Sequence, residues 1–227
     1  QYALQPLALD ETTHTLGCDL CEDYPRVTNP HSEPTAPEYG GAVPTADGKG
    51  HTSFECSVCG YPLGEVTAHS EYNEYGSCVA CGFTPVMSDS AGNLYNEVTY
   101  EDALKKAAEG EVDWLQLESH ATNEYQGIWR YTFVLGSSDK PVTLKTNGLT
   151  LVSLGHTPAL TVNGGELIIA DNAALEGADG IAGDPSTSAI RVTGGELTFE
   201  GTVNATGGSD TSSAAPAIEV TGGKVTF

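Results

Sequence analysis

The sequence predicts a mostly β protein in which a small Cys/His module precedes a parallel β-solenoid with an N-terminal capping helix. Three observations support this fold class. A motif with the same Gly-Gly corner occurs three times near the C-terminus, a helix with terminal signals precedes it, and all six cysteines lie in Cys-x-x-Cys pairs. The glycine count of 27 and the 7% aromatic content favour short strands and many turns. We therefore expect three parts: a Cys/His module with a Pro/Gly-rich linker (1–90), a capping helix with the first strands (91–141), and solenoid repeats (142–227).

The C-terminal third contains the repeat. The segments ALTVNGGELII (159–169), AIRVTGGELTF (189–199) and AIEVTGGKVTF (217–227) align at offsets of 30 and 28 residues, and VTLKTNGLTL (142–151) is a degenerate copy 18 residues before the first. Apolar residues alternate with polar ones in each copy, which is the period of a β-strand with one buried face. The Gly-Gly or Asn-Gly pair suits a corner that needs positive φ. Because one copy cannot bury its own inward face, the copies must stack.

The offsets also predict where the turns differ in length. If the shortest turn has 18 residues, the later turns carry additional residues at 170–188 and 200–216. These segments are small and polar, with Asp171, Asp179, Asp184 and Asp210. Loops on one edge of a solenoid are common binding sites. The alternative is that they are solvated loops that each contain one more short strand (173–175 and 203–205).

The middle of the chain predicts a helix at residues 100–109. Thr99 and Asp102 have the spacing of a capping box, apolar residues follow at helical intervals, and Gly110 suits the position after the helix. Strands are expected at 112–117, 131–135 and 142–144. A short amphipathic helix at this place would cover the open core of the first solenoid turn.

The cysteine spacing predicts a metal site. Cys56/Cys59 and Cys78/Cys81 are each followed by glycine and are separated by 18 residues. This agrees with the gap of about 15–20 residues in zinc ribbons. Two thiolates on a tight turn can bind one tetrahedral ion, and a site closed by four protein ligands is structural. The third pair, Cys18/Cys21, lacks the glycine, and residues 22–50 form a Pro/Gly/Thr-rich linker.

The histidines leave the ligand grouping open. One arrangement has a four-cysteine site (56, 59, 78, 81) and a second site from His14, Cys18, Cys21 and another histidine. The other arrangement has His51, Cys56, Cys59 and His69 in one site, and Cys78/Cys81 with Cys18/Cys21 in the other. His31 lies in a Pro-rich stretch. We expect one or two structural zinc ions. The alternative is that the pairs form disulfides, as in an exported protein.

Charge excludes some partners. The formal charge of −22 argues against binding of nucleic acid or anionic membranes, and the carboxylates make Ca²⁺ a second candidate ion. No run of 18 apolar residues predicts a membrane span. The chain starts at Gln1 and has its single Met at position 87, so we expect a removed leader or a trimmed chain. Because Phe227 ends within a repeat, we expect either further turns or a subunit that stacks there.

Two segments resemble parts of known proteins. Residues 51–83 resemble short Cys/His modules of large cell-surface proteins from Gram-positive gut-type anaerobes. Residues 97–227 resemble pectin-lyase-like right-handed β-helix regions of bacterial surface proteins. These resemblances imply an extracellular location at the bacterial surface and a structural or adhesive role, with self-association or other surface proteins as partners.

Two other functions are weighed against this expectation. A carbohydrate-binding module would use the loops at 170–188 and 200–216, but these loops lack Trp and Tyr. A polysaccharide lyase or hydrolase would need clustered carboxylates or Ca²⁺-binding Asp beside a basic residue. The basic residues of the repeats are Lys145, Arg191 and Lys224, with Arg191 and Lys224 at different positions of the repeat. We therefore expect no catalytic activity.

Overall fold

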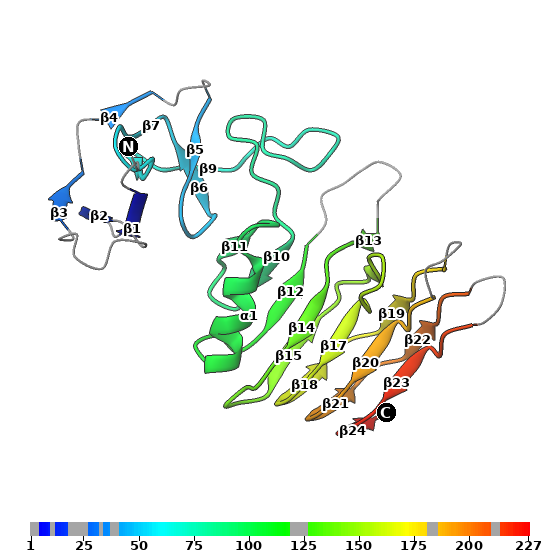
Figure 1. Ribbon diagram of the computed structural model, residues 1–227. Helices are drawn as coiled ribbons and strands as arrows, with labels where there is room; N and C mark the ends of the chain where they lie inside the picture. The colour runs from blue at the N-terminus through cyan, green and yellow to red at the C-terminus, as the bar shows by residue number, and fades with distance from the viewer. Residues whose placement is uncertain are drawn as a thin grey trace. The chain divides into compact units, whose positions relative to one another are not determined.

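The computed structural model describes residues 5–9, 12–17, 27–31, 34–36, 41–118, 127–180, 186–209 and 214–227. The chain forms two compact units (Figure 1). The first contains Gln1–Glu71 and Cys78–Gly82, and the second contains Tyr72–Ser77 and Phe83–Phe227. The division falls before residue 90, because β10 (Met87–Asp89) pairs with a solenoid strand.

The described residues of the first unit form three small antiparallel sheets. Each has three strands, in the orders β1-β2-β3, β4-β7-β8 and β5-β6-β9. The strands are β1 (Gln5–Leu9), β2 (Thr13–Gly17), β3 (Val27–Pro30), β4 (Pro34–Thr35), β5 (Val43–Pro44), β6 (Gly50–Thr52), β7 (Phe54–Cys56), β8 (Pro62–Leu63) and β9 (Thr67–Ala68). Within the described part of this unit, the buried side chains are those of His14, Thr52, Cys56 and Cys78. Apart from these two cysteines, no apolar side chain whose burial is described in this unit is buried.

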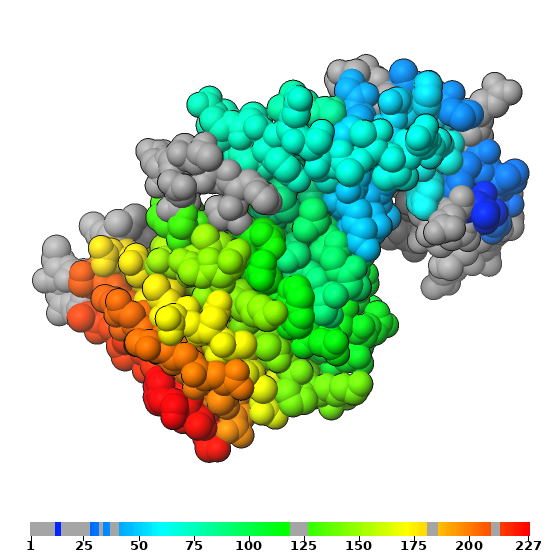
Figure 2. All heavy atoms as spheres, turned by 180° about the vertical axis from the view of Figure 1, so that it is seen from behind, coloured from blue at the N-terminus to red at the C-terminus, as the bar shows by residue number. Residues whose placement is uncertain are grey.

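The second unit is the predicted parallel β-solenoid, of about three turns. Successive strands of each turn lie on three different faces, and on each face the strands of neighbouring turns pair in parallel. The first face contains β12 (Leu115–Leu117), β15 (Val142–Lys145), β18 (Glu166–Ile169), β21 (Glu196–Phe199) and β24 (Lys224–Thr226). The second contains β13 (Ile128–Trp129), β16 (Thr150–Val152), β19 (Ala173–Glu176) and β22 (Val203–Thr206). The third contains β14 (Phe133–Leu135), β17 (Leu160–Val162), β20 (Ile190–Val192) and β23 (Ile218–Val220). In Figure 2 the successive turns form adjacent bands of colour.

Stacked apolar ladders form the core of the solenoid. On the third face Leu160 lies beside Ile190, which lies beside Ile218, as the repeat predicts. On the first face the ladder runs Leu115, Leu144, Ile169 and Phe199. These side chains are buried, apart from the half-buried Ile218. Alternation with a period of two therefore places one apolar residue of each strand on its counterpart in the next turn.

The helix α1 (Tyr100–Glu109) has the predicted bounds and contributes Ala103, Leu104 and Ala107 to the core. It packs near β10, which also pairs with β11 (Leu94–Tyr95), and near β12 and β15. Gly110 ends the helix with φ 73°. The expected capping box is wrong, because the Thr99 hydroxyl donates to Asn96 Oδ1 and accepts the Asn96 N–H.

The predicted register of residues 142–151 is also wrong. Val142 lies beside Leu167, a shift of 25 residues, whereas an 18-residue turn would have placed it beside Leu160. Each turn has three strands and three corners, and the Asn147-Gly148 corner joins the first and second faces. The Gly-Gly corners join the third and first faces, as between β17 and β18. The two motifs look alike because each corner needs positive φ, which Asn147 (55°) and Gly165 (67°) both adopt.

The longer segments contain the additional strands that the alternative interpretation predicted. Residues 170–188 include β19, and residues 200–216 include β22, which pairs with it in parallel. Asp184 and Asp210 lie outside the described residues. Among the described residues, no helix has the length and apolar character needed to cross a membrane.

Candidate metal centre

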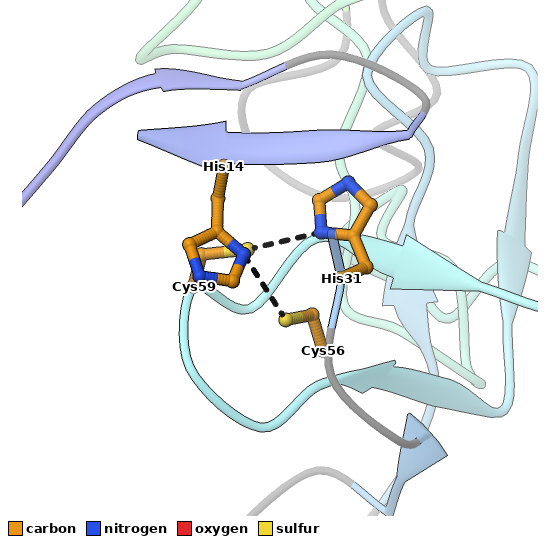
Figure 3. A group of neighbouring side chains, drawn as sticks. All are labelled: His14, His31, Cys56 and Cys59. Carbon is orange, nitrogen blue, oxygen red and sulfur yellow. Dashed lines mark hydrogen bonds between the residues drawn. The ribbon is translucent and has the colours of Figure 1, made fainter. Parts of the chain in front are cut away.

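Four side chains of the first unit converge in what we call cluster A, which contains His14, His31, Cys56 and Cys59 (Figure 3). His14 lies on β2, His31 follows β3, and Cys56 ends β7. The Sγ of Cys56 lies 3.9 Å from His14 Nδ1, and the Sγ of Cys59 lies 3.5 Å from His31 Nδ1. The His31 ring stacks on Tyr61 with a centroid separation of 4.6 Å, which orients the imidazole.

A second group, cluster B, contains His51, His69, Cys78 and Cys81. His51 lies on β6 and His69 follows β9. The Sγ of Cys78 lies 3.9 Å from His51 Nδ1, the Sγ of Cys81 lies 3.6 Å from His69 Nδ1, and the two Nδ1 atoms are 3.5 Å apart. The composition and approximate spacing of cluster B are therefore those of cluster A.

The same backbone turn presents the two thiols of each cluster. The N–H of Gly60 donates to the Cys56 carbonyl at 2.8 Å, and the N–H of Gly82 donates to the Cys78 carbonyl at 2.8 Å. These glycines have φ of 71° and 73°. Residues with a Cβ rarely adopt this conformation, which explains the glycine after each pair. The Cys-x-x-Cys-Gly motif therefore encodes a local turn that presents both sulfurs to one ion.

The distances fit a tetrahedral ion. Zn–S bonds near 2.3 Å and Zn–N bonds near 2.0–2.1 Å imply S···N edges of about 3.6 Å and N···N edges of about 3.3 Å. The observed S···N distances are 3.5–3.9 Å, the N···N distance is 3.5 Å, and all ligand atoms of a cluster lie within 4.8 Å of one another. No disulfide joins Cys56 to Cys59 or Cys78 to Cys81, which disfavours the disulfide alternative for these pairs. Either cluster could hold one metal ion.

Burial shifts the pKa of two of these groups. It raises the pKa of the Cys59 thiol, and the neighbouring Cys56 adds to this effect. It lowers the pKa of His69, with a further contribution from His51. A neutral imidazole is the form that binds a metal, whereas a thiol must lose its proton to do so. Metal binding at these groups would therefore release protons mainly from cysteine.

The structure groups the ligands differently from both arrangements considered above. The four cysteines do not share a site, and Cys56/Cys59 joins His14 and His31 instead of His51 and His69. Cys18 and Cys21 lie outside the described residues. His31 is a ligand candidate that the sequence interpretation missed. A signal for it exists, because nine residues separate Cys21 from His31 and nine also separate Cys59 from His69.

The polar groups of the solenoid mostly connect its turns. The Asp171 carboxylate accepts the N–H groups of Thr146 and Asn147, and Asp179 accepts the N–H and hydroxyl of Ser209. Arg191 pairs with Glu219 at 2.8 Å on the third face, whereas Lys224 pairs with Glu196 at 2.7 Å on the first. The two ion pairs therefore lie on different faces.

Comparisons with known proteins add no relative: no protein-family model, curated protein or solved structure matches the chain.

Proposed function

We propose that this chain is a structural or adhesive protein of a bacterial surface, and that two zinc ions hold its N-terminal unit together. The observation that carries the proposal is the composition of clusters A and B, each with two cysteines and two histidines. Four protein ligands complete a tetrahedral site and leave no position for a substrate or a reactive water. Such sites stabilise folds.

The ligand types favour zinc over other ions. Thiolate and imidazole together suit Zn²⁺, whereas Ca²⁺ and Mg²⁺ prefer oxygen ligands. Because the d shell of Zn²⁺ is filled, its d-electrons favour no particular ligand geometry, and the ion readily accepts four ligands in a tetrahedral arrangement. The buried Cys56 and His14 place half of cluster A away from water, which suits a permanent ligand set.

The solenoid supports a structural role in a different way. The same arrangement of short strands recurs from turn to turn. Within the described residues, ion pairs and carboxylates connect successive turns. Repeat architectures of this kind provide extended surfaces for assembly or adhesion. The separation of Arg191 and Lys224 on different faces supports a protein without catalytic activity, because lyase and hydrolase sites need clustered charged groups.

The metal part of the proposal is tested by elemental mass spectrometry together with a thiol count under denaturing conditions. We expect two zinc ions per chain and free thiols at the cluster cysteines. Absence of both metal and free thiols would mean that disulfides replace the zinc sites.

The surface role needs a separate test. Intact cells that produce the protein are treated with a protease that cannot enter them, and the remaining chain is measured by quantitative mass spectrometry. We expect the chain to be lost while a cytosolic control protein stays intact. Full retention of the chain, with degradation only after lysis, would overturn the surface location.

A further inference from the structure

The two histidine pairs occupy equivalent places in two copies of one structural unit. His14 on β2 lies opposite Asn29 on β3, and His31 follows two residues after Asn29. His51 on β6 lies opposite Thr67 on β9, and His69 follows two residues after Thr67. In both sheets the first histidine is on the central strand. We name residues 5–31 the first repeat and residues 43–69 the second repeat.

Each described cysteine pair converges on a histidine pair that begins earlier in the chain. Cys56 and Cys59 lie between β6 and β9, so they belong to the second repeat, yet they converge on His14 and His31 of the first. In the same way, Cys78 and Cys81 follow the second repeat and converge on its histidines. Each of these two Cys-x-x-Cys turns therefore lies next to the histidine pair of the repeat that comes before it in the chain.

This arrangement places one ligand of each cluster on a short common segment. His51 of cluster B lies on β6, and Cys56 of cluster A ends β7, only five positions later. Both strands are central strands, since β6 pairs with β5 and β9, and β7 pairs with β4 and β8. Between them Thr52 is buried, and its hydroxyl donates to the Phe54 carbonyl at 2.8 Å. An ion in either cluster would therefore hold one end of this segment.

We propose that the ion in cluster A joins the two repeats, and that residues 50–56 couple the two clusters so that filling one increases the metal affinity of the other. The inference rests on the proposed metal binding. The first ion bound orders the shared segment, and the second ion then binds a site in which one ligand is already in place. Because coupling between sites is reciprocal, each ion must raise the affinity of the other by the same factor, typically about 5- to 150-fold.

The test uses the full chain, stripped of metal and titrated with Zn²⁺ against a competing chelator. Native mass spectrometry counts the ions on each molecule. Coupled sites fill together, so we expect chains with two ions to exceed chains with one ion at half-saturation. His69→Ala disables cluster B and His31→Ala disables cluster A. We expect each variant to bind one ion. Its intact cluster should bind zinc about 5- to 150-fold more weakly than the same cluster does in a wild-type chain whose other cluster is filled.

His156→Ala is the matched control, because this exposed histidine lies in the solenoid outside both clusters. It should keep two ions and the wild-type affinities. His69→Cys guards against a simple folding defect, since it restores four ligands to cluster B. We expect this variant to fill cluster B and to recover the affinity of cluster A.

The outcomes separate two failures. A wild-type chain that binds no zinc overturns the proposed metal centre itself. A wild-type chain that binds two ions, with affinities unchanged in His69→Ala and His31→Ala, overturns only the coupling. A His69→Cys chain that fills cluster B while cluster A stays weak also overturns the coupling.

Discussion

The two units are both built from short strands, but the kinds of side chain that they bury differ. In the solenoid, buried side chains such as Leu144, Leu167 and Trp129 form a continuous apolar core. In the described part of the first unit, three of the four buried side chains (His14, Cys56 and Cys78) belong to clusters A and B. Apolar burial stabilises at any time, whereas a metal cluster stabilises only when its ion is bound. The stability of the two units should therefore respond to different variables.

Metal removal should give the largest difference between the units. Structural zinc in small domains contributes about 10–16 kcal/mol of apparent binding free energy at neutral pH. Among the described side chains of the first unit, Cys56 and Cys78 are the only buried apolar ones, so little apolar burial there could replace that contribution. We expect a chelator to unfold the first unit and to leave the solenoid folded. Hydrogen exchange by segment measures this, with zinc-saturated chelator as the control. Equal protection of both units after metal removal would contradict the comparison.

Truncation of a side chain in the solenoid core should destabilise the solenoid and leave metal binding by the first unit unchanged. Leu167 is fully buried between Val142 and Leu197, so Leu167→Ala should lower the free energy of unfolding of the solenoid by about 2–5 kcal/mol. The neighbouring Ile168 is half-buried on the outer side of the same strand, so Ile168→Ala should lower this free energy by less than Leu167→Ala does. Urea denaturation gives both values. Similar losses in the two variants, or loss of metal in either, would contradict this assignment.

Alanine substitutions at two glycine corners of the solenoid distinguish destabilisation by backbone strain from destabilisation by steric clash. Gly148 has φ 71° and open space where the Cβ of an alanine would lie, so Gly148→Ala should destabilise by about 1–2 kcal/mol. Gly195 has φ 73°, and an added Cβ would overlap the Gly165 carbonyl oxygen of the preceding turn. Gly195→Ala should therefore cost more than Gly148→Ala. Thermal unfolding of the two variants tests the order, and the reverse order would mean that the turns adjust easily.

The buried Asp89 should make the solenoid sensitive to acid. Burial would raise the pKa of Asp89, but hydrogen bonds from Tyr95, Asn93 and Ala91 outweigh it and lower the pKa below its ordinary value. A lowered native pKa stabilises the fold above about pH 4, and this contribution is lost as the pH falls below that value.

The corresponding variant is Asp89→Asn. Its amide nitrogen would replace an oxygen that accepts hydrogen bonds, so we expect a loss of about 1–3 kcal/mol at pH 7. The loss should shrink as the pH falls below about 4, where the wild type also loses the charge. Urea denaturation at pH 7 and pH 3, followed by solenoid fluorescence, measures the difference. A pH-independent difference would show that the charge of Asp89 contributes nothing.

Local patterns predicted much of the fold. The alternation of Leu160, Val162, Leu167 and Ile169 predicted their buried faces, and the repeat predicted the ladder from Leu160 to Ile190 and Ile218. The helix at 100–109 and its terminal Gly110 were also predicted. The capping box failed because Asn96 competes for the Thr99 hydroxyl. The position of residues 142–151 failed because two different corners share the same conformational demand.

What lies within a few residues could be deduced from the order of the amino acids. The glycine after Cys59 or Cys81 permits the turn that presents two sulfurs, and strand alternation identifies the inward side chains. Which histidines meet which cysteines was decided only in three dimensions, because Cys56 lies 42 positions from His14 in the chain. Sheet pairing sets that contact: β2 with β3 and β7 with β4 bring distant segments together, and no short-range pattern encodes such a choice.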